Sequence, residues 1–183
     1  MASFLILLAG LAAVALYLIG LYNKLVRNRN LAEEGWSGIE VQLKRRADLI
    51  PNLITTVKGY MKHEKDLLTE VTELRSKSMA TQEVGKKGQL ENALSRSLTH
   101  LFAVAENYPN LKANENFLDL QKQLTEIEDQ IQMSRRYYNG TVRELNIMIE
   151  SFPSNLVANM FSFKKKEFFD MDEREGAVPK VEF

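Results

Sequence analysis

The first 22 residues limit what this chain can fold into more than any other stretch does. Residues 2–22 carry no charged side chain, and Lys24, Arg27 and Arg29 follow them directly. As an α-helix, a segment of this length extends about 31 Å, close to the roughly 30 Å hydrocarbon core of a bilayer. We therefore expect a transmembrane anchor over residues 1–22, with the three basic side chains at the membrane interface.

Two other interpretations of this stretch are weaker. Ala13-Val14-Ala15 offers the small residues of a signal-peptide cleavage site, but the basic cluster follows the apolar run instead of preceding it. A buried core helix is disfavoured by the length of the uninterrupted apolar run. By the positive-inside rule, the basic cluster predicts that the N-terminus lies outside and that the remaining chain lies in the cytoplasm.

The composition of the remaining chain excludes several classes of function. Lysine and arginine together number 24, as do aspartate and glutamate, so no overall charge attracts nucleic acid. The chain has no cysteine, which excludes disulfides, thiolate metal sites and a cysteine nucleophile. We accordingly predict no nucleic-acid partner.

Beyond the anchor, apolar residues recur every three or four positions, which is typical of amphipathic helices. Pro51 is expected to end the first of these helices and Pro153 the last. A polar stretch with two glycines, residues 77–88, predicts a loop between the second helix and the third. The first expected helix covers residues 23–47. The second has Asp48 as its N-cap and Pro51 in its first turn, and it fades near residue 78; the third covers 90–105 and the fourth 117–149.

This pattern predicts an all-α fold, in which an N-terminal transmembrane helix precedes an elongated antiparallel up-down-up-down four-helix bundle. The expected domains are the anchor at 1–22, the bundle at 23–152 and a C-terminal tail at 153–183. Because successive helices alternate in direction, the turns at 48–52 and 108–116 would meet at the end far from the membrane. We call this expected end the distal tip.

The distal tip is rich in polar residues that could bind a protein partner. Helix capping and turn formation explain asparagines at such positions equally well. The candidate partner-binding residues are Asp48, Asn52, Asn107, Tyr108, Asn110, Lys112, Asn114 and Asn116.

The search for catalytic residues gives little. His63 and Glu64 begin like a zinc-protease signature, but the second histidine is missing because position 67 is leucine. Glu126, Glu128 and Asp129 form the tightest acidic group, which on a bundle helix is usually solvated. We therefore predict a protein that is not an enzyme and has no metal or cofactor, with a metal enzyme using Glu128 as the alternative. The basic run 44–46 is interpreted as a solvated helix end.

The C-terminal tail combines aromatic residues with a run of lysines. Such a combination suits a membrane headgroup interface, but the same aromatics could instead close the open end of the bundle. Both interpretations stay open, and they are compatible. The residues concerned are Phe161, Phe163, Lys164, Lys165, Lys166, Phe168 and Phe169, with Leu156, Val157 and Met160 before them.

Several stretches together resemble the LemA family, and the resemblance covers nearly the whole chain. One departure is Ala47, where the family often has histidine, so no role of that histidine carries over. The stretches lie at residues 22–30, 34–37, 41–53, 57–64, 105–117, 135–139, 152–153, 161–163 and 179–183.

This resemblance implies a bacterial inner-membrane protein with a long helical bundle and no known catalytic residues. The function of the family is not established, although some members are linked to magnetosome formation. Our leading hypothesis is a membrane-anchored scaffold or adaptor that binds a protein partner or its own copies. Small residues such as Gly10, Gly20 and Gly35 favour self-association. The alternative is membrane remodelling or lipid sensing through the tail.

Overall fold

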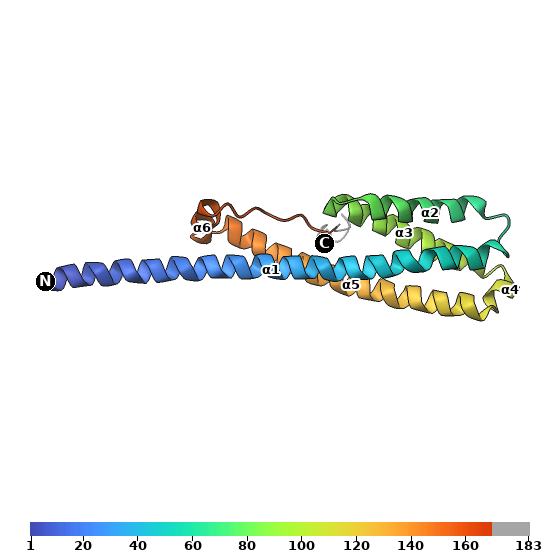
Figure 1. Ribbon diagram of the computed structural model, residues 1–183, viewed down its shortest axis with the longest axis horizontal. Helices are drawn as coiled ribbons and strands as arrows, with labels where there is room; N and C mark the ends of the chain where they lie inside the picture. Colours follow the sequence, from blue (N-terminus) through green and yellow to red (C-terminus); the bar gives the residue numbers. More distant parts are fainter. Residues whose placement is uncertain (170–183) are drawn as a thin grey trace, which may run out of the picture. The chain divides into compact units, whose positions relative to one another are not determined.

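The computed structural model describes residues 1–169, and these are helical apart from short links and the C-terminal stretch 161–169 (Figure 1). No strand occurs within this described range. The helices are α1 (Ala2–Lys58), α2 (Lys65–Ala80), α3 (Val84–Ala105), α4 (Pro109–Lys112), α5 (Glu115–Glu150) and α6 (Ser154–Met160). The all-α prediction is therefore confirmed. The expectation for the acidic end of the tail, residues 170–183, lies outside the described range.

Helix α1 begins with the apolar stretch and continues far beyond it. Its most apolar window has a mean hydropathy of 2.6, and no residue of that window is buried. By length and composition, α1 is the one helix within residues 1–169 that can cross a membrane. The first buried side chain is Leu25, and Ala32 and Ile39 follow it on the predicted apolar stripe.

The chain divides into two compact units. Unit 1 comprises Met1–Trp36 and Tyr137–Glu167; unit 2 comprises Ser37–Arg136 with Phe168 and Phe169. Helices α1 and α5 contribute residues to both units. Each unit has a core of its own, and the two are described in turn.

The core of unit 2 draws on five helical segments. In this unit, α2 and α3 lie side by side (Figure 1). Apolar side chains of the long helices α1 and α5 complete the same cluster, and Leu111 of α4 is fully buried in it. The buried members include Ile50, Leu53, Val57, Leu67, Val71, Leu94, Leu98, Leu101, Phe117 and Leu120.

The prediction that Pro51 ends a helix is wrong, because α1 continues through it to Lys58. A proline inside a helix has no N–H to donate to the carbonyl four residues earlier, here that of Ala47. In the structure, Nε of Arg75 on α2 donates to this carbonyl oxygen over 2.6 Å. Arg75 therefore replaces the donor that Pro51 lacks, and the chain leaves α1 only at Gly59.

The predicted loop over residues 77–88 is also mostly wrong. Helix α2 runs to Ala80 and α3 starts at Val84, which leaves a link of residues 81–83. Gly85 lies in the first turn of α3, and Gly88 lies further inside, where a glycine costs about 1 kcal/mol relative to alanine. Packing of α2 against α3 offsets this cost, since Ser78 near the end of α2 and Glu91 of α3 are buried and hydrogen-bonded to each other.

The core of unit 1 is smaller. Leu25 of α1, Leu145 of α5 and Val157 and Ala158 of α6 form its buried centre. In the same unit, a Cβ added to Gly35 would lie 3.2 Å from the Cα of Tyr138, so α1 and α5 approach closely at this glycine. The rings of Trp36 and Tyr138 pack beside this approach, with centroids 5.6 Å apart.

Candidate functional site

Two links of unit 2, residues 59–64 and 106–114, meet through their side chains, and we call this the loop surface. The hydroxyl of Tyr108 donates to Glu64 Oε1 over 3.2 Å. Asn114 Nδ2 donates to the hydroxyl of Tyr60 over the same distance. Asn114 also caps α5, because its Oδ1 accepts the backbone N–H of Phe117 at 3.1 Å.

The phenol of Tyr108 is electrostatically perturbed at this surface. Partial burial raises its pKa above the ordinary value of 10.0, and the negative charge of Glu64 and the hydrogen bond to that carboxylate raise it further. The Tyr108 hydroxyl therefore stays protonated and donates to Glu64 across the physiological pH range. The hydrogen bond that joins the two links is not lost through ionisation of Tyr108 in this range.

The loop surface contains only part of the predicted distal tip. Asp48 and Asn52 do not lie in a turn: both are exposed on α1, because that helix continues through Pro51. The second predicted turn is present, but it contacts Tyr60 and Glu64 instead. Of its remaining candidates, the exposed ones are Asn107, Asn110, Lys112 and Asn116.

A cavity of about 430 Å³ adjoins the loop surface, between the end of α1 and α2. Ile54, Met61 and Leu68 provide its apolar lining. Three lysines belong to the same lining, together with Thr69, Thr72 and Glu73; they are Lys58, Lys62 and Lys65. An apolar site lined by three lysines and one glutamate suits a ligand that carries both apolar and acidic groups.

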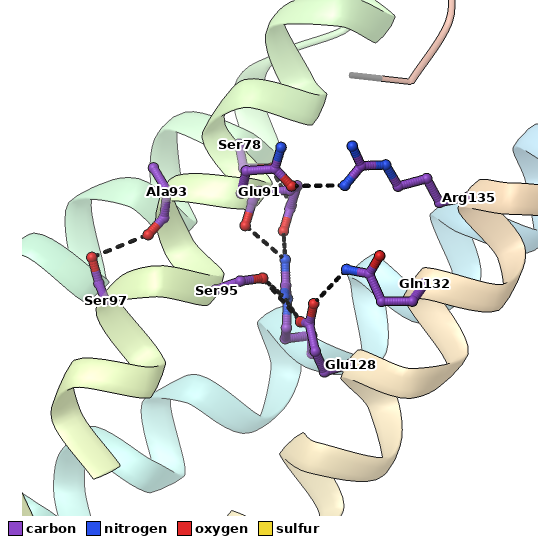
Figure 2. Close-up of polar contacts among 10 residues, drawn as sticks. Ser78, Glu91, Ala93, Ser95, Ser97, Glu128, Gln132 and Arg135 are labelled. Atoms are coloured by element: carbon purple, nitrogen blue, oxygen red, sulfur yellow. Dashed lines mark hydrogen bonds and ion pairs between the residues drawn. The ribbon is translucent and has the colours of Figure 1, made fainter. Parts of the chain in front are cut away.

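A buried polar network occupies the middle of unit 2 (Figure 2). Arg46 of α1 forms ion pairs with Glu91 of α3 and Glu128 of α5. Its Nη1 also donates to Ser95 Oγ over 2.7 Å, and Ser95 in turn donates to Glu128 at 2.9 Å. Ser78 of α2 donates to Glu91. The four long helical segments of unit 2 are thus joined by one set of hydrogen bonds.

This network overturns two sequence-based expectations. Arg46 is not part of a solvated helix end, since it is only 1 % exposed. Glu128 is not a free surface carboxylate, because it pairs with Arg46 and accepts Gln132 Nε2 at 2.9 Å (Figure 2). The arrangement suits a structural role better than a catalytic one, because fixed hydrogen-bond donors hold each carboxylate.

No group of three histidine, aspartate or glutamate side chains within residues 1–169 gathers as a metal site. His63 and His100 are both exposed. The alternative of a metal enzyme built on Glu128 gains no further ligand from the described residues, and the non-enzymatic character stays a prediction.

In unit 1, the end of α6 determines which tail aromatics are buried. Ser162 adopts a left-handed conformation with φ of 55°. The N–H of Phe163 reaches the Ala158 carbonyl at 2.9 Å and that of Ser162 reaches Asn159 at 3.2 Å, which is a Schellman motif. This turn directs Phe163 against the core, whereas Phe161 is 53 % exposed.

The other predicted membrane-interface residues divide in the same way. Lys24, Arg27 and Arg29 are exposed, and Arg29 lies over the Phe163 ring at 5.5 Å. Lys165 pairs with Glu150, and Lys166 lies 3.4 Å from Glu33. Lys164 is exposed, Phe168 is half-buried and Phe169 is buried. Core formation therefore accounts for Phe163 and Phe169, while a lipid contact of the other tail residues stays a prediction.

Three hydrogen bonds fix the tail of unit 1 along α5. Asn146 Nδ2 donates to the Lys166 carbonyl at 2.9 Å, and Asn146 Oδ1 accepts the Lys166 N–H at 3.0 Å. The Tyr138 hydroxyl donates to the Glu167 carbonyl over 2.8 Å. Burial, and secondarily the charge of Glu167, raises the pKa of Tyr138 to about 12.

Comparison with known proteins adds the family. The family model described as LemA family matches residues 35–183. The chain belongs to the LemA family. The resembling stretch 41–53 contains Arg46 and Pro51, and the stretch 105–117 contains Tyr108 and Asn114, so both features of unit 2 lie within LemA-like sequence.

Individual relatives share about a quarter of the aligned residues. Protein LemA of Metamycoplasma hominis is 28% identical over 86% of this chain and 72% of its own length. Magnetosome protein MamQ 2 of Paramagnetospirillum magneticum is 25% identical over 86% of this chain and 67% of its own. Magnetosome protein MamQ of Magnetospirillum gryphiswaldense is 23% identical, with 81% and 64% covered.

Sequence reasoning missed the network, although one signal was present. Arg46 lies three residues after Leu43 and four before Ile50, which places it on the buried stripe of α1. A charged residue at such a position requires partners inside the fold. Nothing in local sequence identifies Glu91 and Glu128 as those partners, since they lie 45 and 82 residues away.

Proposed function

We propose that this LemA-family protein is a non-enzymatic adaptor anchored in the bacterial inner membrane. In this proposal, residues 2–22 cross the bilayer with the N-terminus outside, and unit 2 is an antiparallel up-down-up-down four-helix bundle in the cytoplasm. The exposed apolar start of α1 and the basic residues after it support the anchoring and the orientation.

The observation that carries the adaptor role is the loop surface with its adjoining cavity. Hydrogen bonds from Tyr108 and Asn114 fix the two links, so the surface is preorganised, which lowers the entropic cost of binding. The lysine-bearing apolar cavity favours a protein segment that combines acidic and apolar side chains. We therefore place the partner site at Lys62, Lys112 and the residues around them.

Site-specific photo-crosslinking in native membranes tests this function. A photoreactive amino acid replaces Lys62 or Lys112, both exposed near the loop surface, and Lys122 on α5 serves as the exposed lysine control. We expect one discrete adduct from the first two positions and none from Lys122. The adduct should disappear when Lys58 and Lys65 are changed to glutamate. Adducts of equal yield from all three positions would contradict a specific partner site.

A partner can also be a second copy of this chain. Gly10 and Gly20 of α1 have no atom within 4 Å of an added Cβ, so both leave room for a neighbouring helix. Crosslinks between two differently tagged copies in one membrane would identify self-association. A monomeric mass in detergent, measured by light scattering, would argue against it and leave a different protein as the partner.

A further inference from the structure

We infer that the outer face of α6 lies in the membrane interface, directly beside the transmembrane segment, as a second contact of unit 1 with lipid. The inference rests on the anchoring proposed above, but not on the partner site of unit 2. It concerns residues 152–161 and the adjoining end of the apolar stretch.

The first observation is an apolar patch on α6 and its flanks. Phe152, Leu156, Met160 and Phe161 are 80, 56, 74 and 53 % exposed. Large apolar side chains gathered in this way on a soluble surface mark an interaction site. One polar residue, Asn159, lies on the same exposed side, and headgroups can satisfy its amide.

The second observation is that the opposite side of α6 is fixed in the core. Ser154, Val157 and Ala158 are buried, and the latter two pack with Leu25 and Leu145. The Schellman motif at Ser162 holds the end of the helix. The patch therefore cannot turn inward, and its apolar side chains stay outside unless something else covers them.

The third observation identifies lipid as that cover. Phe161 packs on Tyr22, with ring centroids 4.6 Å apart, and Tyr22 is the last residue of the apolar stretch 2–22. The patch is thus continuous with an apolar surface that is exposed along its entire most apolar window. Aromatic residues at the end of a hydrophobic span are typical of the bilayer interface.

Charges around the patch agree with this placement. Lys24 and Arg27 are exposed within the next two turns of α1, where they can bind anionic headgroups. An amphipathic helix with apolar residues outward and basic residues nearby is the usual form of an interfacial helix. A single spanning helix can rotate about its own axis, and a second lipid contact would remove this freedom from unit 1.

The absence of native cysteine permits a direct test in the full chain. Single cysteines replace Leu156 or Met160, and each carries an environment-sensitive fluorophore after reconstitution into liposomes of zwitterionic and anionic lipid. Leu11→Cys in the anchor is the membrane control, and Glu144→Cys, exposed on α5 of the same unit, is the aqueous control. Iodide reports contact with water, and brominated lipid reports contact with acyl chains.

We expect the labels at 156 and 160 to resist iodide and to be quenched by brominated lipid, as at position 11, while the label at 144 shows the reverse. Quenching of 156 and 160 by iodide, with position 11 protected, would overturn the inference and leave the anchoring intact. Protection from both quenchers would mean a protein cover, which also overturns it. Iodide quenching at position 11 would refute the anchoring itself.

Discussion

The contact between Arg75 and the Ala47 carbonyl makes a prediction about how α1 tolerates Pro51. If Arg75 supplies the donor that the proline lacks, its removal should matter only while the proline is present. We expect Arg75→Met, which keeps an unbranched side chain but loses the guanidinium group, to reduce the free energy of unfolding by about 1.5–3 kcal/mol. This is the range for a lost hydrogen bond from a charged donor to a carbonyl; here Ala47 is buried and Arg75 is half-buried.

The proline variant completes the thermodynamic cycle. An interior proline costs a helix about 3 kcal/mol, and the Arg75 contact has already offset part of this cost. Pro51→Ala should therefore stabilise the protein by about 1–2 kcal/mol. In this background, the new N–H of residue 51 serves the Ala47 carbonyl, so Arg75→Met should cost less than about 1 kcal/mol. The expected coupling energy is then about 1–2 kcal/mol.

Urea unfolding of the full chain in detergent, followed by far-ultraviolet circular dichroism, measures the unsubstituted protein, the two single variants and the double variant. Arg45→Met is the matched control, because Arg45 is exposed on α1, the helix that contains Pro51, and contacts only Gln42 in the described hydrogen bonds. Its effect should stay within about 0.5 kcal/mol. Additive effects of Pro51→Ala and Arg75→Met, with a coupling below about 0.3 kcal/mol, would refute the compensation.

Three further predictions concern the other polar features. Glu91→Ala leaves Arg46 with an incomplete set of buried partners and should lower the free energy of unfolding by about 3–5 kcal/mol, measured as a melting temperature about 6–20 °C lower. The control Glu73→Ala breaks an exposed ion pair and should change the melting temperature by at most about 2 °C. Ser162→Gly should stabilise the protein by about 0.5–1 kcal/mol in urea unfolding, since glycine adopts the left-handed conformation without strain; a loss of stability would contradict this. Because the pKa of Tyr138 is raised from 10.0 to about 12, the stabilisation by its protonated hydroxyl is complete below pH 10 and is lost as the pH rises through 12. Across this interval, the melting temperature of Tyr138→Phe should fall less steeply with pH than that of the unsubstituted protein. An equal slope for the two proteins would refute the raised pKa of Tyr138.

The helical stripes were predictable because they depend on local spacing. Leu25, Ala32, Ile39, Leu43 and Ile50 were placed on one face of the first helix by their intervals alone, and all five are buried. The same periodicity gave the stripe of α5. Apolar burial dominates such helices, so a short sequence window contains enough information to identify their buried face.

The errors arose wherever a distant residue supplies a missing partner. Pro51 ends a helix by its own chemistry, yet Arg75 on the next helix satisfies the carbonyl it leaves open. Arg46 belongs to a basic run by sequence, but Glu91 and Glu128 make its burial possible. The prediction of part of the candidate site was wrong for the same reason, because residue 48 was assigned to a turn where α1 in fact continues. Local patterns cannot supply such long-range pairings.

The polar network around Arg46 also has a consequence for the order in which the chain is synthesised. Glu91 and Glu128 are made 45 and 82 residues after Arg46, so the ribosome exposes the arginine long before either carboxylate exists. Burying an unpaired guanidinium group is costly, so complete burial of Arg46 requires both carboxylates. Because Glu128 lies on α5, Arg46 can be buried with all its partners only after the last of the four long helical segments has been made.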